Sequence, residues 1–366
     1  MSDATQQPAI AYREATPADT PGILALLERA FGFPPDPERF DWVYFRNTGD
    51  GTTPSYVAEC GGRIVGHNGS LPVRLWHGGR VVSGLYTLEV ATDPDFQGRG
   101  IFARLGQLTL DGAREHGVAI VRIFPNLNSA PAFYNRLGYT ELTPFPVVAR
   151  LLGNLRPLIA ARQPALAPAA ALADAALRVG RLQARQAARK AQATGARTVP
   201  VESFGPWADR LWESLRDGAG TATVRDARFL QWRYLEGPHR YAILGLDRGA
   251  GPVGFAVVGV RPWKGGRAAE LMELMVEPGD RAGAELLIAE AVLHAAREGA
   301  VALRTWVSPR HPHGEAFRRA RFRPLPARLR ADYSFGAIVL DDAAADPATA
   351  LAMDGWTITT GDIEYI

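Results

Sequence analysis

Short apolar runs alternate with helical patterns along this chain, and the alternation predicts buried strands separated by helices. Residues 85–90 and 118–124 are strand-like apolar runs. Between them, residues 103–116 place apolar side chains at helical spacing. Nearer the N-terminus, residues 19–31 predict a helix and residues 55–75 predict a hairpin. Buried strands that alternate with helices are typical of an α/β fold whose mixed sheet is covered on both faces.

The second half of the chain repeats the first half, loosely but in the same order. The segment WHGGR at residues 76–80 recurs as WKGGR at residues 263–267. Glu89, at the end of an apolar run, recurs as Glu273. A fixed order at a nearly constant offset predicts duplication of one α/β unit, and a chain of 366 residues has room for two domains.

We therefore expect two tandem mixed-sheet α/β domains joined by a helical connector. The predicted ranges are 1–150 for the first domain, 151–200 for the connector, 201–340 for the second domain and 341–366 for a C-terminal tail strand.

The connector is rich in alanine and arginine, and Asp174 is its only acidic residue. With eight cations and one anion, the segment carries a charge of +7, and the rest of the chain carries 3 − 7 = −4. The net charge of +3 therefore gives no argument for nucleic-acid binding by the folded domains. One face of its predicted helix would be basic. It has two interpretations: a surface for an anionic membrane or acidic partner, or a solvated connector helix. We favour the connector because its apolar face is mostly alanine. The residues of the basic face are Leu177, Arg178, Arg181, Leu182 and Arg185.

Composition excludes several classes of protein. Cys60 is the only cysteine, so no intrachain disulfide can form, and a reducing cytoplasm is the expected location. The sequence has no run of about 18 apolar residues, so no integral membrane segment is expected. The first residues lack the pattern of a signal peptide. The seven histidines are scattered, so no metal site is expected.

The most informative stretch is residues 93–102, DPDFQGRGIF, which lies between a predicted strand and a predicted helix. Gly98 and Gly100 let the backbone approach an anion, and Arg99 adds charge. The first N–H groups of the following helix have no internal partner and point at such an anion. A strand, a glycine-bearing turn and a helix in this order predict a phosphate cradle.

These residues resemble the acetyl-CoA signature of the GNAT (N-acetyltransferase) superfamily, with Phe102 standing where glycine or alanine is usual. Residues 126–139 resemble the second GNAT signature through the spacing of Tyr134, Gly138 and Tyr139, although the asparagine spacing differs slightly. The resemblance implies that the fourth and fifth strands of the first copy separate and that acetyl-CoA binds there. The implied acetyl-CoA-binding residues are Val90, Ala91, Thr92, Gln97, Gly98, Arg99, Gly100, Ile101, Phe102, Asn128 and Ser129.

Acyl transfer to an amine needs a polarised carbonyl, a proton donor for the leaving thiolate and a base for the amine. Tyr134 matches the tyrosine that many GNAT enzymes use as the acid; its alternative role is packing. The base stays open. Glu89 is one candidate, although the glutamate kept at position 273 argues for a structural role, and His67 is another.

A third candidate for the base comes from the tail. The chain resembles the family of the enhanced intracellular survival protein, whose C-terminal carboxylate returns to the first active site. This resemblance implies a role for the carboxylate of Ile366, or for Asp362 or Glu364. That family's third, sterol-carrier-like domain has no room here. The layout is also similar to GNAT proteins associated with glycan and polysaccharide biosynthesis.

The second copy is expected to be degenerate. Residues 279–284, which include Asp280, stand where the first copy has its glycine loop, and Arg318 stands where the first copy has Tyr134. The overall hypothesis is an acetyl-CoA-dependent N-acetyltransferase acting on the primary amine of a small molecule, either an amino sugar or an aminoglycoside-like compound. Alternatives are a longer acyl-CoA, an O-acceptor, or a CoA-binding regulatory protein without turnover. The sequence leaves the acceptor and any homo-oligomer open.

Overall fold

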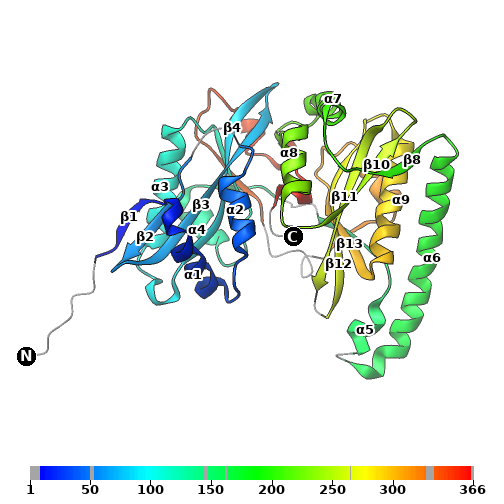
Figure 1. Ribbon diagram of the computed structural model, residues 1–366, viewed down its shortest axis with the longest axis horizontal. Helices are drawn as coiled ribbons and strands as arrows, with labels where there is room; N and C mark the ends of the chain where they lie inside the picture. The colour runs from blue at the N-terminus through cyan, green and yellow to red at the C-terminus, as the bar shows by residue number, and fades with distance from the viewer. Residues whose placement is uncertain are drawn as a thin grey trace, which may run out of the picture. The chain divides into compact units, whose positions relative to one another are not determined.

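The computed structural model describes residues 9–49, 53–143, 147–160, 163–263, 265–326 and 334–363. The chain divides into two compact units, each built on one mixed sheet (Figure 1). Unit 1 comprises Met1–Thr143 and Asp332–Ala352, and unit 2 comprises Pro144–Ala331 and Met353–Ile366. The predicted pair of mixed-sheet α/β domains is therefore confirmed.

The sheet of unit 1 has the strand order β1-β2-β3-β4-β5-β15-β6. Neighbours are antiparallel except β4 and β5, which are parallel. A two-residue turn joins β3 to β4 at Gly78 and Gly79, both with positive φ, as hairpin turns of this length require. The strands are β1 (Ala11–Glu14), β2 (Tyr56–Cys60), β3 (Arg63–His77), β4 (Arg80–Thr92), β5 (Ile120–Ile123), β6 (Thr140–Glu141) and β15 (Gly336–Val339).

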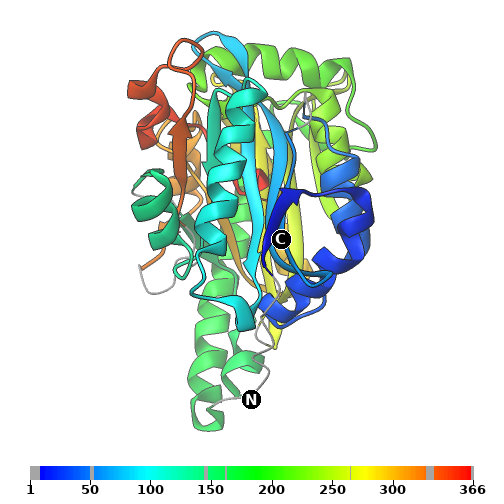
Figure 2. The ribbon, with the colours of Figure 1, turned by 90° about the vertical axis from the view of Figure 1, so that its left-hand side faces the viewer.

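Helices cover both faces of this sheet. Their bounds are α1 (Thr20–Phe31), α2 (Pro37–Phe45), α3 (Ile101–Glu115), α4 (Ala130–Leu137) and α11 (Pro347–Ala350). Helices α3 and α4 pack on a cluster that includes Val90, whereas α1 and α2 pack on a cluster that includes Ala91. Successive residues of a strand point to opposite faces, so the two helix pairs lie on opposite sides of β4. Figure 2 views the sheet from the side that α3 covers.

The sheet of unit 2 has the order β14-β7-β13-β12-β11-β10-β8, and β12 and β13 form its parallel pair. The strands are β7 (Val147–Leu151), β8 (Arg197–Pro200), β10 (Tyr241–Asp247), β11 (Pro252–Trp263), β12 (Gly266–Met275), β13 (Ala300–Trp306) and β14 (Arg323–Pro324), with the short β9 (Ala222–Thr223) apart from that order. The helices are α5 (Leu155–Ala160), α6 (Ala167–Gln192), α7 (Pro206–Leu215), α8 (Ala227–Gln231), α9 (Arg281–Arg297) and α10 (Gly314–Arg319).

The predicted connector helix is present as α6, but its alanine face is not solvated. Ala184, Ala188 and Ala191 are buried in the core of unit 2, where α6 packs on α9 (Figure 1). Arg181 on the same helix donates to the carbonyl oxygen of Leu152. Small alanine side chains let two helices approach closely, so this segment is part of unit 2 rather than a free linker. None of the helices in the described ranges has the length and apolarity that crossing a membrane requires.

The two units exchange their closing strands, which the predicted ranges did not foresee. Strand β7 follows the elements of unit 1 but pairs with β13 of unit 2. Strand β15 follows those of unit 2 but pairs with β5 and β6 of unit 1. Residues 147–150 therefore leave the expected first domain, and residues 336–339 leave the expected second. Both sheets offer the same slot beside their parallel pair, so an apolar pattern alone cannot choose between them.

The tail expected as a strand instead forms short helical turns over its described residues, 341–363. Asp346 caps α11 through the backbone N–H groups of Ala348 and Thr349. Thr359 caps a 3₁₀ turn, η8 (Thr360–Asp362), by accepting from the N–H of Gly361. Side chains that satisfy the first N–H groups favour a helical turn over an extended strand.

Candidate active site

Strands β4 and β5 of unit 1 separate partway along their length. Their parallel ladder ends at Thr87 and Ile123, while β4 continues to Thr92. The separation begins at a bulge in which Glu89 has a φ of 51°. This left-handed conformation costs a residue with a side chain about 1–2 kcal/mol, so it persists only where its surroundings hold it. The expected gap between the fourth and fifth strands is therefore present in unit 1.

Val90, Ala91 and Thr92 form the end of β4 that lies beyond the ladder with β5. On the other edge of β4, Ala91 pairs with His67 and Thr92 with Gly66 of β3. The structure thus brings these three predicted residues to the gap. That their N–H groups polarise a bound carbonyl stays a prediction.

The glycine loop leads from β4 into α3 and is open to solvent. Gly98 and Gly100 both have a φ of 76°, and Gly100 is the N-cap of α3. A Cβ atom at either glycine would meet nothing within 4 Å. Gln97 is exposed, and the Arg99 guanidinium lies 4.7 Å from the ring centroid of Phe96. An open loop at a helix N-terminus with a cation beside it fits a pyrophosphate.

Buried charge holds this loop in place. The carboxylate of Asp93 is fully buried and accepts hydrogen bonds from Arg63 and, at 2.8 Å, from Arg29. It also accepts from the N–H of Asp95 at 3.1 Å. Burial alone would raise the pKa of Asp93, but these bonds hold it below its ordinary value. These contacts fix the position of Asp93, the residue at which the loop begins.

Ile101 and Phe102 use their side chains for packing. Ile101 is 1% exposed and belongs to the core beside Leu105. Phe102 is half-buried and meets Phe133 edge-on at a centroid distance of 5.0 Å. Their side chains face the core, so only their backbone N–H groups are suited to an anion. Phe102, which stands where the GNAT signature usually has glycine or alanine, thus packs against Phe133 of α4.

Asn128 and Ser129 lie in the loop before α4, and a residue that the prediction omitted organises them. The side-chain oxygen of Asn126 accepts from the N–H groups of Asn128 and Ser129, at 3.0 Å each. This turn fixes the start of α4. Asn126 begins the second GNAT signature, so the sequence held the signal for it.

Tyr134 lies on α4 and is partly buried. Its hydroxyl oxygen is 2.6 Å from the hydroxyl oxygen of Ser334, which precedes β15. Burial raises the pKa of Tyr134 to about 12, although the bond to Ser334 acts in the opposite direction. The phenol is therefore protonated at neutral pH, as a proton donor must be. No sequence pattern pointed to Ser334, because the exchange of closing strands brings it here.

Glu89 is buried and forms an ion pair with Arg39 of α2. Glu89 Oε1 lies 2.6 Å from Arg39 Nη1, and both side chains are at most 9% exposed. The ion pair therefore engages one oxygen of this carboxylate in a structural contact. The contact ties α2 to the strained residue of the bulge. The sequence analysis did not select Arg39. It lies next to Phe40, in an aromatic segment that recurs in the second copy, and this repeat could have pointed to it.

His67 lies on β3 opposite the bulge. Its Nδ1 atom is 2.9 Å from the backbone carbonyl oxygen of Glu89. Burial lowers the pKa of His67, and the nearby carboxylate of Glu89 acts in the opposite direction. The structure therefore joins two of the candidate bases, Glu89 and His67, to the same bulge.

Unit 2 presents a closed version of the phosphate loop. Asp280 caps α9 by accepting from the N–H of Gly283 at 2.8 Å. Its carboxylate also pairs with Arg248 at 2.7 Å. The protein's own carboxylate thus takes the position where the first copy offers free N–H groups. An anion at this helix start would meet like charge.

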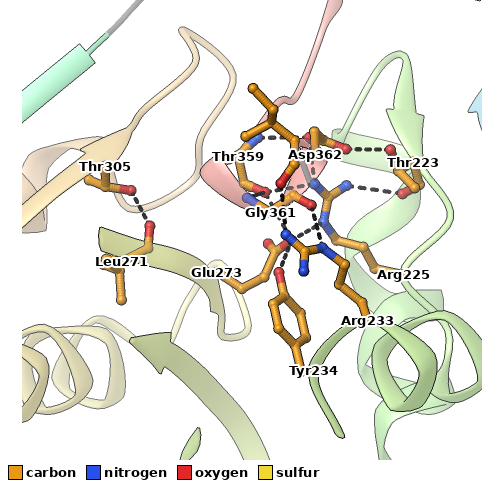
Figure 3. A network of polar contacts seen from close by, with 11 residues as sticks. Thr223, Arg225, Arg233, Tyr234, Leu271, Glu273, Thr305, Thr359, Gly361 and Asp362 are labelled. Atoms are coloured by element: carbon orange, nitrogen blue, oxygen red, sulfur yellow. Dashed lines mark hydrogen bonds and ion pairs between the residues drawn. The ribbon is translucent and has the colours of Figure 1, made fainter. Parts of the chain in front are cut away.

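The gap in unit 2 is also filled. The tail contacts β12 through Thr359 and Glu273 and contacts β13 through Thr360 and Trp306, beyond the end of their ladder. Figure 3 shows the buried network around Arg225, which donates to Glu273 at 3.0 Å and to Asp362 at 2.7 Å. A side chain at Gly361 would collide with the hydroxyl of Tyr234. That the second copy is degenerate stays a prediction, which these contacts favour.

Of the three candidate bases in the tail, the structure describes only Asp362. Asp362 lies in the network of unit 2, where Arg225 and Thr223 bind its carboxylate. Ile366 and Glu364 lie outside the described residues. In the part of the chain that the structure describes, no group of three or more histidine, cysteine or carboxylate side chains could hold a metal ion.

Comparison with known protein families finds a match over part of the chain. Residues 11–142 match the model of the acetyltransferase (GNAT) domain. This range contains the gap, the glycine loop and Tyr134. Comparison with curated proteins finds no match.

Solved structures share the fold over nearly the whole chain. A GCN5-related N-acetyltransferase from Kribbella flavida is 18% identical with a TM-score of 0.59, and the match covers 94% of this chain and 74% of that one. Eis1 from Mycobacterium abscessus is 13% identical with a TM-score of 0.53, covering 94% and 76%. A tandem GNAT protein from the clavulanic acid biosynthesis pathway is 15% identical with a TM-score of 0.55, covering 90% and 98%.

The fold is therefore the tandem GNAT fold, and residues 11–142 are a GNAT acetyltransferase domain. The acetyltransferase domain that the resemblance predicted is confirmed over this range.

Proposed function

We propose that unit 1 transfers an acetyl group from acetyl-CoA to the primary amine of a small molecule, with an amino sugar or an aminoglycoside-like compound as the acceptor. One observation carries the proposal. Within a single unit, the gap between β4 and β5 occurs together with the open loop of Gly98 and Gly100 and the protonated hydroxyl of Tyr134. Unit 2 has the same gap, but the tail fills it and Asp280 closes its loop.

Acetyl-CoA supplies the thioester, and the residues of unit 1 divide the remaining work. The N–H groups at the start of α3 and the Arg99 side chain hold the pyrophosphate. The N–H groups of residues 90–92 are suited to stabilise a developing oxyanion at the gap. Tyr134 gives a proton to the departing sulfur. Glu89 holds the bulge through Arg39 and does not act as the base.

We further propose that the reaction takes place in the cytoplasm. The support is the cysteine content, since the single cysteine of the sequence, Cys60, suits a reducing compartment.

Calorimetry with acetyl-CoA and a CoA-release assay test this function. We expect one acetyl-CoA per chain and release of CoA that depends on an added primary amine. The assay panel contains glucosamine, kanamycin and a simple alkylamine. Two equivalent binding sites, or none, would overturn the assignment to unit 1. Binding without amine-dependent release would overturn the transfer reaction.

A further inference from the structure

His67 has one nitrogen committed to the fold and one without a partner. A carbonyl oxygen can only accept, so the contact between Nδ1 and the carbonyl of Glu89 places the proton on Nδ1. The lone pair is then on Nε2. Within the described ranges, Nε2 is buried and has no hydrogen-bond partner. A neutral imidazole in this tautomer, with its orientation fixed by the backbone, is the form that accepts a proton.

A cavity of about 360 Å³ in unit 1 borders His67 and Ser70 of β3 and the rings of Phe40 and Tyr44 of α2. Of these two residues of β3, His67 has its side chain on the face that α2 covers, whereas Ser70 points its side chain to the other face, because the extra residue of the bulge lies on β4 and residues three apart on β3 face opposite ways. The residue whose imidazole nitrogen is buried without a partner, His67, therefore borders a cavity that is large enough for a small ligand.

The chemistry of the cavity indicates what it binds. Its described lining residues carry hydroxyl, amide and aromatic groups and no charged side chain. Aromatic faces with hydroxyl and amide groups suit a hydroxyl-rich molecule, whereas several ammonium groups would lack counter-charges in this lining. The polar residues, apart from His67 and Tyr44, are Thr16, Thr20, Asn47, Thr53, Ser55 and Ser70.

His67 and Tyr134 lie on opposite faces of the sheet. His67 meets the ring of Tyr44 on α2 at a centroid distance of 6.0 Å. Tyr134 packs against the cluster beneath α3 and α4. The gap between β4 and β5 opens the sheet between these two faces. A base on one face and an acid on the other suit a reaction in which the nucleophile enters from one side and the leaving group departs on the other.

We propose that this cavity is the acceptor site, that His67 Nε2 is the proton acceptor, and that the acceptor is a small hydroxyl-rich molecule with a single amine. The proposal rests on the function proposed above. The amine nitrogen bonds to the acetyl carbon, and the carbon–sulfur bond breaks. The amine proton passes to His67 Nε2, and the sulfur takes the proton of the Tyr134 hydroxyl. Proton exchange with water restores both side chains, so atoms and charge balance.

Nuclear magnetic resonance of the wild-type protein tests the base without any variant. The imidazole ¹⁵N signals of His67 should show the proton on Nδ1 and a midpoint of titration below the ordinary pKa of about 6.5. The groups that face this ring are Glu89 of β4, with its partner Arg39, and Tyr44 of α2. Saturating glucosamine should shift the Nε2 signal. A proton found on Nε2, or no shift with glucosamine while acetyl-CoA binds, would overturn the proposal.

His67→Gln provides the kinetic test, and His77→Gln is its matched control. His77 is also buried on β3, but its Nε2 accepts from the N–H of Asp346. We expect His67→Gln to bind acetyl-CoA normally and to lose about 10²–10⁴-fold in kcat/KM for glucosamine. The low-pH limb of the wild-type profile should disappear. His77→Gln should keep both. Equal activity of the two variants would overturn the role of His67, and faster turnover of kanamycin than of glucosamine would overturn the acceptor class. Failure of the wild type to bind acetyl-CoA would instead refute the proposed function.

Discussion

The hydroxyl oxygens of Tyr134 and Ser334 lie 2.6 Å apart, although 200 residues separate them in the chain. Ser334 directly precedes β15, which completes the sheet of unit 1 after the chain has formed unit 2. The surroundings of the candidate proton donor therefore depend on a segment beyond the second copy. A fragment ending near residue 150 would lack both Ser334 and β15, so we expect the proposed reaction of unit 1 to need the longer chain.

Replacing Tyr134 by phenylalanine tests its role as the acid. The variant keeps the ring and its packing and loses only the hydroxyl, so turnover should fall by about 10²–10⁴-fold. Acetyl-CoA affinity, measured by calorimetry, should change little. If Tyr134 only packs, damage appears in Tyr134→Ala alone. A phenylalanine variant within about threefold of the wild type, on a substrate for which chemistry limits the rate, would end the assignment.

Ser334→Ala should weaken the acid without removing it. The bond from Ser334 lowers the pKa of Tyr134 against the effect of burial, so its loss leaves a phenol that gives up its proton less readily. We expect about a tenfold loss of turnover, which corresponds to about 1.4 kcal/mol. In the Tyr134→Phe background the same change should cost nothing. A double-mutant cycle measures this coupling, and equal losses in both backgrounds would show that Ser334 acts elsewhere.

Gly100→Asp should remove acetyl-CoA binding, because it places a carboxylate where the pyrophosphate is expected. Gly117→Asp is the matched control at the other end of α3. Both glycines have positive φ, and a Cβ at either would meet nothing within 4 Å. Backbone strain is then similar in the two variants. We expect at least about a 100-fold loss of affinity, or about 2.7 kcal/mol, for Gly100→Asp alone. Similar affinities in calorimetry would contradict the cradle.

Asp280→Ala should affect stability and leave acetyl-CoA binding unchanged. Asp280 caps α9, and loss of such a cap costs about 1 kcal/mol of unfolding free energy. Asp280→Asn keeps a capping oxygen and should stay close to the wild type in urea unfolding. The number of acetyl-CoA molecules bound per chain should be one in all three proteins. A tenfold change in affinity or turnover with an intact fold would contradict a degenerate second copy.

The local features of the site could be predicted from the sequence. Gly98 and Gly100 marked the loop because only special backbone angles allow such a turn before a helix. The repeat predicted two sheets, and the alternation of apolar runs with helices predicted that each is a mixed sheet covered on both faces. These features depend on residues close together in the chain, so a pattern can reveal them.

The rest depends on contacts that no local pattern encodes. Strand β15 could have closed either sheet, since both offer the same slot, and Ser334 reaches Tyr134 only through the choice made. Arg39 binds Glu89 because a bulge turns that residue into a left-handed conformation. The tail was expected as a strand, but the buried network around Arg225 holds it in a 3₁₀ turn.

Buried His311 of unit 2 should make the stability of the protein depend on pH. Burial lowers the pKa of His311 to about 3, and His313 and Arg225 act in the same direction. In the unfolded chain this histidine takes up a proton below about pH 6.5, whereas in the folded chain it stays neutral until about pH 3. The unfolded state therefore binds more protons in this window, and stability falls as the pH decreases. Between pH 7 and pH 5 the unfolding free energy should fall by about 2 kcal/mol because of this residue.

The variant His311→Asn tests this prediction, because it keeps an acceptor for the N–H of His313 and removes the titration. Urea unfolding at both pH values should show a smaller loss for the variant, and an equal loss in the two proteins would contradict the role of His311.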